Sequence, residues 1–90
     1  MGFSRSVIEA AWERSGGYCE CVRRGHGHQG RCKHPLLESS RGSDCDYGWE
    51  AHRIIARDSD RLSNCEILCQ DCYKQAEMYD LQRDSLFVKN

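Results

Sequence analysis

WEAHRIIARDSDRLSNCEILCQDCY, residues 49–73, is the stretch of this chain that decides its fold. Apolar residues recur in its first part, at Trp49, Ala51, Ile54 and Ile55. They surround His52 and Arg53, and the charged run 57–61 follows, a pattern typical of a buried strand that ends in a loop. The cysteines at 69 and 72 have the spacing that lets both sulfurs reach one zinc ion at ~2.3 Å. The stretch therefore predicts a strand, a loop and a cysteine pair at the start of a helix.

Two motifs in this stretch resemble the HNH endonuclease family. The family subgroup reads Trp-Glu-x-His-His-Ile and then Leu-Ser-Asn-Cys-Glu-x-Leu-Cys-x-x-Cys-His-Lys. This chain has Trp-Glu-Ala-His-Arg-Ile at 49–54 and Leu-Ser-Asn-Cys-Glu-Ile-Leu-Cys-Gln-Asp-Cys-Tyr-Lys at 62–74. The resemblance implies a small α+β fold, a zinc-stabilised, treble-clef-like ββα-metal finger over 49–81, in which two strands and a helix clamp a divalent ion on DNA.

The resemblance also assigns roles to single residues. It makes His52 the strand ligand of the catalytic metal and Asn64 the asparagine that holds the loop. Arg53 stands where the family has the histidine that activates water, and Tyr73 stands where it has a metal-binding histidine. Arginine has no lone pair to accept a proton, whereas imidazole, with a reference pKa of about 6.5, does so near neutral pH. His52 and Glu77 alone would hold Mg²⁺ or another divalent ion weakly, so we expect impaired water activation.

A different alignment of the motif does not repair the site. Moving the register by one residue would make His52 the base and put Ala51 at the ligand position, where it cannot bind metal. The apolar pair 54–55 after the polar doublet fits the first register better, because an apolar residue directly follows the base in the family.

A structural zinc site is implied by the same resemblance. Segment 18–36 is rich in cysteine and histidine and looks like a knuckle with a glycine-rich insertion, of the kind that joins the two cysteines at the helix start. The favoured quartet is Cys19, Cys32, Cys69 and Cys72. Cys21 competes for either place in the knuckle, and His26 or His28 could serve a second zinc. Cys65 is expected to be a buried small hydrophobe, and Cys45 a free or core thiol.

Composition narrows the class of protein. Ninety residues form one small domain, 1–90, that needs a metal or disulfides to hold it, and it contains seven cysteines. No signal peptide or membrane span is expected, so we predict a cytoplasmic protein with reduced thiols, in which cysteines bind zinc. The net charge of −1 lacks the basic excess of proteins that grip DNA electrostatically.

An N-terminal helix is predicted over 6–16. Ser6 can cap it with Glu9 three residues on, and the pair Gly16-Gly17 ends it. Trp12 lies on its apolar stripe and is expected to pack in the core, so that the helix forms a lid on the finger.

The intact frame and the altered site together predict a catalytically impaired, HNH-like zinc protein that acts as a binding module or inhibitor. The resemblance suggests a phage-encoded protein directed at a host defence complex, of the anti-CRISPR or anti-restriction type. Two alternatives remain open: an active, divergent metal-dependent DNA endonuclease or nickase, and an enzyme inactivated by substitutions at positions 53 and 73. The sequence predicts no oligomeric state.

Overall fold

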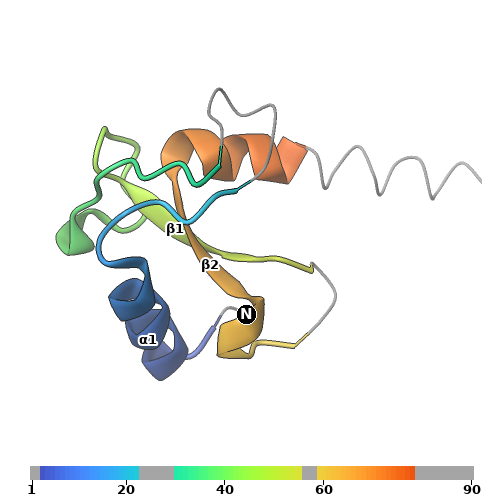
Figure 1. Cartoon of the computed structure of the whole chain (residues 1–90). Coiled ribbons are helices and arrows are strands. Elements are labelled where there is room, and N and C mark those ends of the chain that lie inside the picture. The colour runs from blue at the N-terminus through green and yellow to red at the C-terminus, as the bar shows by residue number, and fades with distance from the viewer. Residues whose placement is uncertain (1–2, 23–29, 56–58, 79–90) are drawn as a thin grey trace, which may run out of the picture.

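The structure, a computed structural model, describes residues 3–22, 30–55 and 59–78 of the chain. It is a small α+β fold (Figure 1). Its elements in chain order are α1 (Arg5–Ser15), η1 (Glu38–Ser40), β1 (Trp49–Arg53), η2 (Leu62–Asn64), β2 (Cys65–Cys69) and a second helix that covers 70–78 of the described residues. Within the described ranges, no helix has the length and apolar character that crossing a membrane requires.

The two strands form an antiparallel pair, and the second helix begins directly after β2. Trp49 lies opposite Cys69, and His52 lies opposite Glu66. All five residues of β2 are buried, as expected for a strand that is covered on both faces. Figure 1 shows α1 and the second helix on either side of the strands. The predicted order of strand, strand and helix is thus observed over 49–78, while residues 79–81 lie outside the described part.

Asn64 holds the connection between the strands in place. Its side-chain oxygen accepts a hydrogen bond from the Ile55 amide at 2.8 Å, and its amide group donates to the Ile55 and Ser59 carbonyls at 3.1 and 2.9 Å. The loop-holding position predicted for Asn64 therefore agrees with its hydrogen bonds.

The prediction that Ile54 and Ile55 belong to a buried strand is wrong. β1 ends at Arg53, and the two isoleucine side chains are 49% and 60% exposed. The reason is that the Asn64 side chain hydrogen-bonds to both the amide and the carbonyl of Ile55. These backbone groups therefore do not pair with the other strand, and the chain leaves the sheet at this point.

The N-terminal helix starts earlier than its sequence signals suggest. Ser4, not Ser6, is the N-cap, since its hydroxyl accepts a hydrogen bond from the Val7 amide at 3.3 Å. Glu9 bonds to Arg5 at 2.9 Å instead of closing a capping box with Ser6. The helix ends as predicted, because Gly16 adopts the left-handed conformation with φ of +68°.

The core is small and rich in sulfur. Its large buried side chains are Ile8, Leu36, Trp49, Ile67 and Leu68. Five cysteines are buried among them: Cys19, Cys21, Cys65, Cys69 and Cys72. Trp12, half-buried on α1, stacks on Trp49 with ring centroids 4.8 Å apart, so α1 covers the strands as the lid that its apolar stripe predicts.

The knuckle segment folds back on itself beside β2. Residues 17–21 bond to residues 32–36, with the Cys19 amide donating to the His34 carbonyl at 2.9 Å and the Cys32 amide donating to the Cys21 carbonyl at 2.8 Å. Glu20 joins this segment to β2 in both directions, since its amide donates to the Ile67 carbonyl at 2.7 Å and its carboxylate accepts from the Ile67 amide at 2.9 Å. The positions of His26 and His28, proposed for a second zinc, lie outside the described residues.

Candidate metal centre

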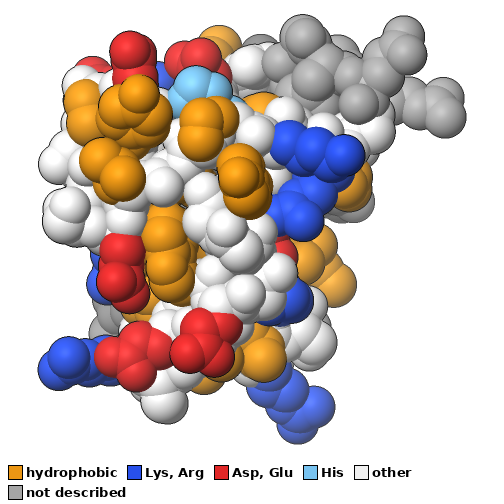
Figure 2. All heavy atoms as spheres, turned by 60° about the vertical axis from the view of Figure 1, so that its left-hand side comes forward, with side chains coloured by type: hydrophobic (Ala, Val, Ile, Leu, Met, Phe, Trp, Pro, Cys, Tyr) orange, Lys and Arg blue, Asp and Glu red, His pale blue; other side chains and the backbone are white. Residues whose placement is uncertain are grey.

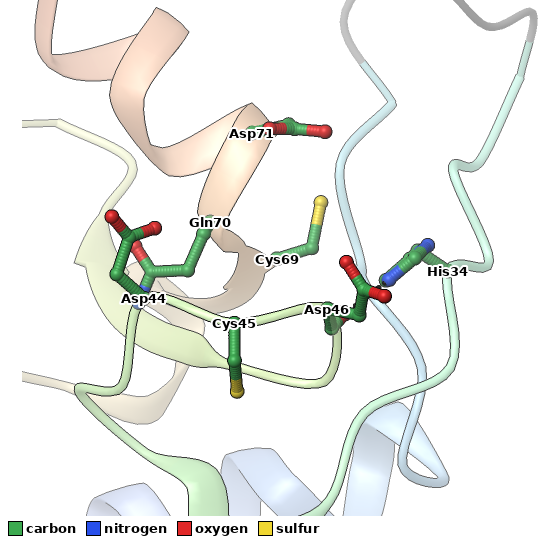
Figure 3. Close-up of a pocket in the computed structure, with 7 residues that line it drawn as sticks. All are labelled: His34, Asp44, Cys45, Asp46, Cys69, Gln70 and Asp71. Atoms are coloured by element: carbon green, nitrogen blue, oxygen red, sulfur yellow. Dashed lines mark hydrogen bonds between the residues drawn. The ribbon is translucent and has the colours of Figure 1, made fainter.

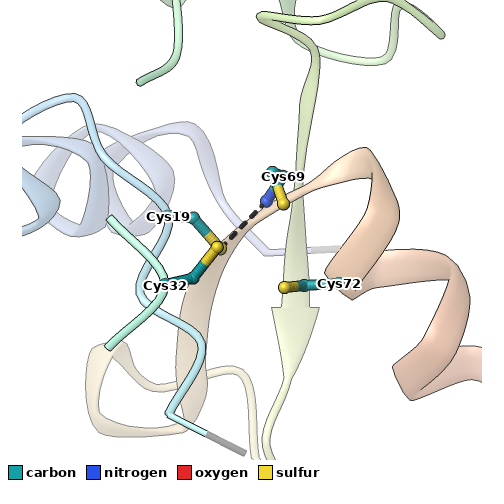
Figure 4. Close-up of side chains that lie close together, drawn as sticks. All are labelled: Cys19, Cys32, Cys69 and Cys72. Atoms are coloured by element: carbon teal, nitrogen blue, oxygen red, sulfur yellow. Dashed lines mark hydrogen bonds between the residues drawn. The ribbon is translucent and has the colours of Figure 1, made fainter. Parts of the chain in front are cut away.

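Four cysteine sulfurs converge where the knuckle meets the start of the second helix (Figure 4). Cys19, Cys32, Cys69 and Cys72 have sulfur atoms that all lie within 4.8 Å of one another. Four thiolates around one zinc at ~2.3 Å would lie about 3.8 Å apart, so a small inward movement completes a tetrahedral site. The four residues fit a structural metal, and they are the quartet that the family resemblance favours.

Each sulfur is placed by a different piece of backbone. Cys69 is the last residue of β2, and Cys72 lies in the first turn of the second helix. Cys19 and Cys32 come from the two arms of the knuckle. The Cys69 amide donates a hydrogen bond to the Cys19 sulfur at 3.2 Å, which holds the knuckle against the helix start and favours a thiolate at Cys19 when metal is bound.

The four thiols share protons when no metal competes for them. Hydrogen bonds from neighbouring thiols, that of Cys19 foremost, lower the pKa of Cys69 from its ordinary value to about 5. The hydrogen bond that Cys19 gives to Cys69 raises the pKa of Cys19, and burial raises that of Cys72. The negative charge of the metal-free cluster therefore lies mainly on the Cys69 thiolate. A divalent cation such as Zn²⁺ would displace the remaining protons and balance the buried charge.

The other three cysteines play different parts. Cys21 is buried and hydrogen-bonds to the Cys72 thiol, but its sulfur lies outside the group of four. Cys65 is buried as predicted, and burial raises its pKa to about 11, so it remains a neutral thiol. Cys45 is exposed and takes no part in the core. All seven cysteines lie in the described ranges, and none of them forms a disulfide.

A second polar cluster surrounds His52 on the side of the sheet that faces the second helix. His52 and Glu66 are 6% and 7% exposed, and the His52 Nδ1 lies 2.8 Å from a Glu66 carboxylate oxygen. The His52 ring meets the Tyr73 ring edge-on at 6.1 Å. Burial, followed by Glu77, which hydrogen-bonds to the phenol, raises the pKa of Tyr73. Tyr73 thus contacts His52 on one side and Glu77 on the other.

Glu66 is the member of this cluster that sequence reasoning did not identify. Antiparallel pairing places it directly opposite His52. The available signal was a carboxylate within the short run between Asn64 and Cys69, in which every residue is buried. A carboxylate in such a strand needs a hydrogen-bonding partner, and the cross-strand histidine supplies it.

Arg53 has contacts of its own that lead away from this cluster. It forms an ion pair with Asp60, and its guanidinium carbon lies 5.6 Å from the centre of the Phe3 ring. Successive strand residues point to opposite faces, and His52 takes the face of the second helix. The side chain at the expected position of the general base is thus bound to the loop and to the N-terminal segment.

The described residues contain one group of three or more histidine, cysteine or acidic side chains close enough to hold a metal ion, and it is the cysteine quartet.

Fold and site together define a small α+β protein with a four-cysteine cluster that can hold a metal ion. Comparison of the chain with protein-family models, curated proteins and solved structures finds no match. What the protein does must therefore follow from its own residues.

Proposed function

We propose that this chain is a zinc-stabilised, HNH-like binding module that no longer hydrolyses DNA. The observation that carries the proposal is the state of Arg53. A guanidinium has no lone pair that can accept a proton, and that of Arg53 is already in contact with Asp60 and Phe3. A residue that cannot accept a proton and is bound elsewhere cannot activate water.

The kind of partner follows from what remains when cleavage is lost. The chain has thirteen basic and fourteen acidic residues, so bulk attraction to nucleic acid is weak and a protein target is favoured. In keeping with the family resemblance, we propose a phage-borne inhibitor that binds a host defence complex, of the anti-CRISPR or anti-restriction type.

One observation favours the alternative of an active nuclease with a divergent site. An ionised Glu66 can only accept, so His52 donates from Nδ1, and in the neutral ring Nε2 is then the nitrogen that carries the lone pair. Histidines that bind metals commonly donate their other ring nitrogen to a carboxylate in this way. His52 is therefore oriented like a metal ligand, and Glu77 and Tyr73 are the nearest candidates to complete a site for Mg²⁺ or another divalent ion.

Plasmid relaxation by the purified, zinc-loaded protein tests the two functions against each other. The unaltered chain, supplied with Mg²⁺, Mn²⁺ or Ni²⁺, should leave the plasmid supercoiled, and metal analysis should find about one zinc per chain. Nicking that disappears in His52→Ala, with an unchanged circular dichroism spectrum, would refute the proposal and establish the nuclease.

The double variant Arg53→His/Tyr73→His asks whether those two positions alone silence the site. Restoring a base contributes on the order of 10²-fold or more in rate, so nicking by this variant would show that the rest of the catalytic frame is intact. The matched control is Arg61→His/Tyr47→His, which makes the same chemical changes at two exposed positions. Nicking by the control as well would trace the activity to added surface histidine.

A further inference from the structure

The outer side of the knuckle carries a row of exposed apolar side chains. Tyr18 pairs with Pro35, and the Leu37 amide donates to the Tyr47 carbonyl at 3.2 Å. These four residues, which we name the apolar strip, are exposed, while the residues next to them in the chain, Cys19, Leu36 and Gly48, are buried. The strip follows directly from the pairing of extended segments, whose alternate side chains face opposite sides.

The exposure of the strip is high for side chains of this size. Tyr18, Leu37 and Tyr47 are 48%, 51% and 48% exposed. Figure 2 shows hydrophobic side chains gathered on this face beside a histidine, with carboxylates along its upper edge and basic side chains at the right. Contiguous exposed apolar surface of this kind marks sites of interaction.

An acidic pocket adjoins the strip. Its volume is about 170 Å³, and it is lined by His34, Asp44, Cys45, Asp46, Cys69, Gln70 and Asp71 (Figure 3). The His34 ring bonds to the Asp46 carbonyl, and these two residues directly precede Pro35 and Tyr47 of the strip. Pocket and strip are therefore one continuous surface.

The pocket keeps an excess of negative charge. Of its three aspartates, Asp44 is paired with Lys74 at 2.9 Å, and both side chains are more than half exposed, so the pair is screened by water. Asp46 and Asp71 add two further carboxylates. The surface thus offers apolar and aromatic side chains beside net negative charge.

We propose that the apolar strip and the acidic pocket together bind a protein segment that carries an apolar side chain next to lysine or arginine. Tyr18 and Tyr47 supply rigid aromatic area at low entropic cost, and their rings also attract a cation. The carboxylates complement the basic side chain and repel phosphate, which favours a protein over a nucleic acid. The inference rests on the proposed function as a binding module, to which it adds the surface and the chemistry of the partner.

The test is a titration of the zinc-loaded, ¹⁵N-labelled protein, followed by amide chemical shifts. Three probes are compared: a dodecapeptide of Gly-Leu-Lys repeats, one of Gly-Leu-Glu repeats, and a single-stranded DNA dodecamer. Only the Gly-Leu-Lys peptide should shift the amides of Tyr18, Leu37, Asp46 and Tyr47. Leu37→Ser/Asp46→Asn should weaken its binding by about tenfold or more, whereas Ile55→Ser/Glu13→Gln, an exposed apolar and acidic pair outside the strip, should not.

Other results would overturn the inference. Equal shifts with the Gly-Leu-Glu peptide, binding of the DNA at the strip, or no shift with any probe would each refute it. Shifts at the strip that depend on protein concentration without peptide would assign the surface to a second copy of this chain. None of these results bears on cleavage, so they leave the proposed function standing, whereas plasmid nicking by the unaltered chain would refute that function whatever the strip binds.

Discussion

Replacing Cys69 by serine should unfold this protein at neutral pH and ambient temperature. Cys69 is buried, belongs to the four-sulfur group, and accepts the hydrogen bonds that hold its charge. Serine oxygen is a poor zinc ligand beside thiolates, so the variant loses most of the affinity of the site.

The size of the effect follows from how little else holds the fold. Domains are stabilised by roughly 0.05–0.15 kcal/mol per residue, or about 5–14 kcal/mol for ninety residues. Structural zinc in small domains contributes about 10–16 kcal/mol. The core has five large apolar side chains, Ile8, Leu36, Trp49, Ile67 and Leu68, each contributing about 1.5–3 kcal/mol. Loss of the metal would therefore remove a free energy as large as the whole free energy of unfolding.

Circular dichroism and thermal denaturation would measure this, with the unaltered protein in zinc and in excess chelator alongside. Cys69→Ser and the chelated protein should both lack a cooperative unfolding transition. The matched control is Cys45→Ser, an exposed cysteine outside the quartet, which should unfold like the unaltered protein. A cooperative transition within a few degrees of the zinc-loaded protein, seen in Cys69→Ser or after chelation, would refute the reasoning.

Three further predictions concern the strands and the metal. Asn64→Ala should lower the free energy of unfolding by about 2–4 kcal/mol in urea denaturation, since three hydrogen bonds are lost. Asn64→Asp keeps only the acceptor, so its free energy of unfolding should lie between those of the unaltered protein and Asn64→Ala. Glu66→Ala should lower the free energy of unfolding by about 3 kcal/mol in the same experiment, because it leaves His52 buried without that carboxylate. Glu66→Gln should lower it by less. Equal losses in the two variants would count against the pairing of His52 with Glu66. Acid should release the metal, because protons compete with it for the four thiolates, and release should be complete only at acidic pH: the pKa of Cys69 is lowered to about 5 from 9.0 ordinarily, so its thiolate stabilises the fold at high pH and that effect is lost progressively as the pH falls from 9 to 5. A colorimetric zinc assay across pH would contradict this by showing full release at pH 7.

The cysteine pair 69 and 72 was predictable from the sequence because metal-ligand spacing is a local property. The pair 69 and 72 defines one half of the site, and the knuckle must then supply the other half from Cys19, Cys21 or Cys32. The choice among these three was set by pairing of the two knuckle arms, which brings Cys19 and Cys32 inward and leaves Cys21 beside Cys72. The spacing of the cysteines in the sequence does not predict how the two arms of the knuckle pair.

Single hydrogen bonds decided the features that the sequence did not predict. The helix begins at Arg5 because Ser4, and not Ser6, has the extended conformation of an N-cap. Ile54 and Ile55 look like strand residues by type, yet Asn64 draws the backbone of Ile55 out of the sheet. The partnership of His52 with Glu66 required the antiparallel register, which depends on the length of the loop between the strands.

The contacts of Arg53 connect the end of β1 to two neighbouring segments of the chain. Its ion pair with Asp60 links the end of β1 to the loop that Asn64 also holds, and its contact with Phe3 adds the segment that precedes α1. Both partners of the ion pair are about a third or more exposed, so its contribution to stability is small, about 1 kcal/mol or less. Under the proposed function, arginine at position 53 would remove the catalytic base at little energetic cost, while the fold with its four-cysteine cluster stays available for binding.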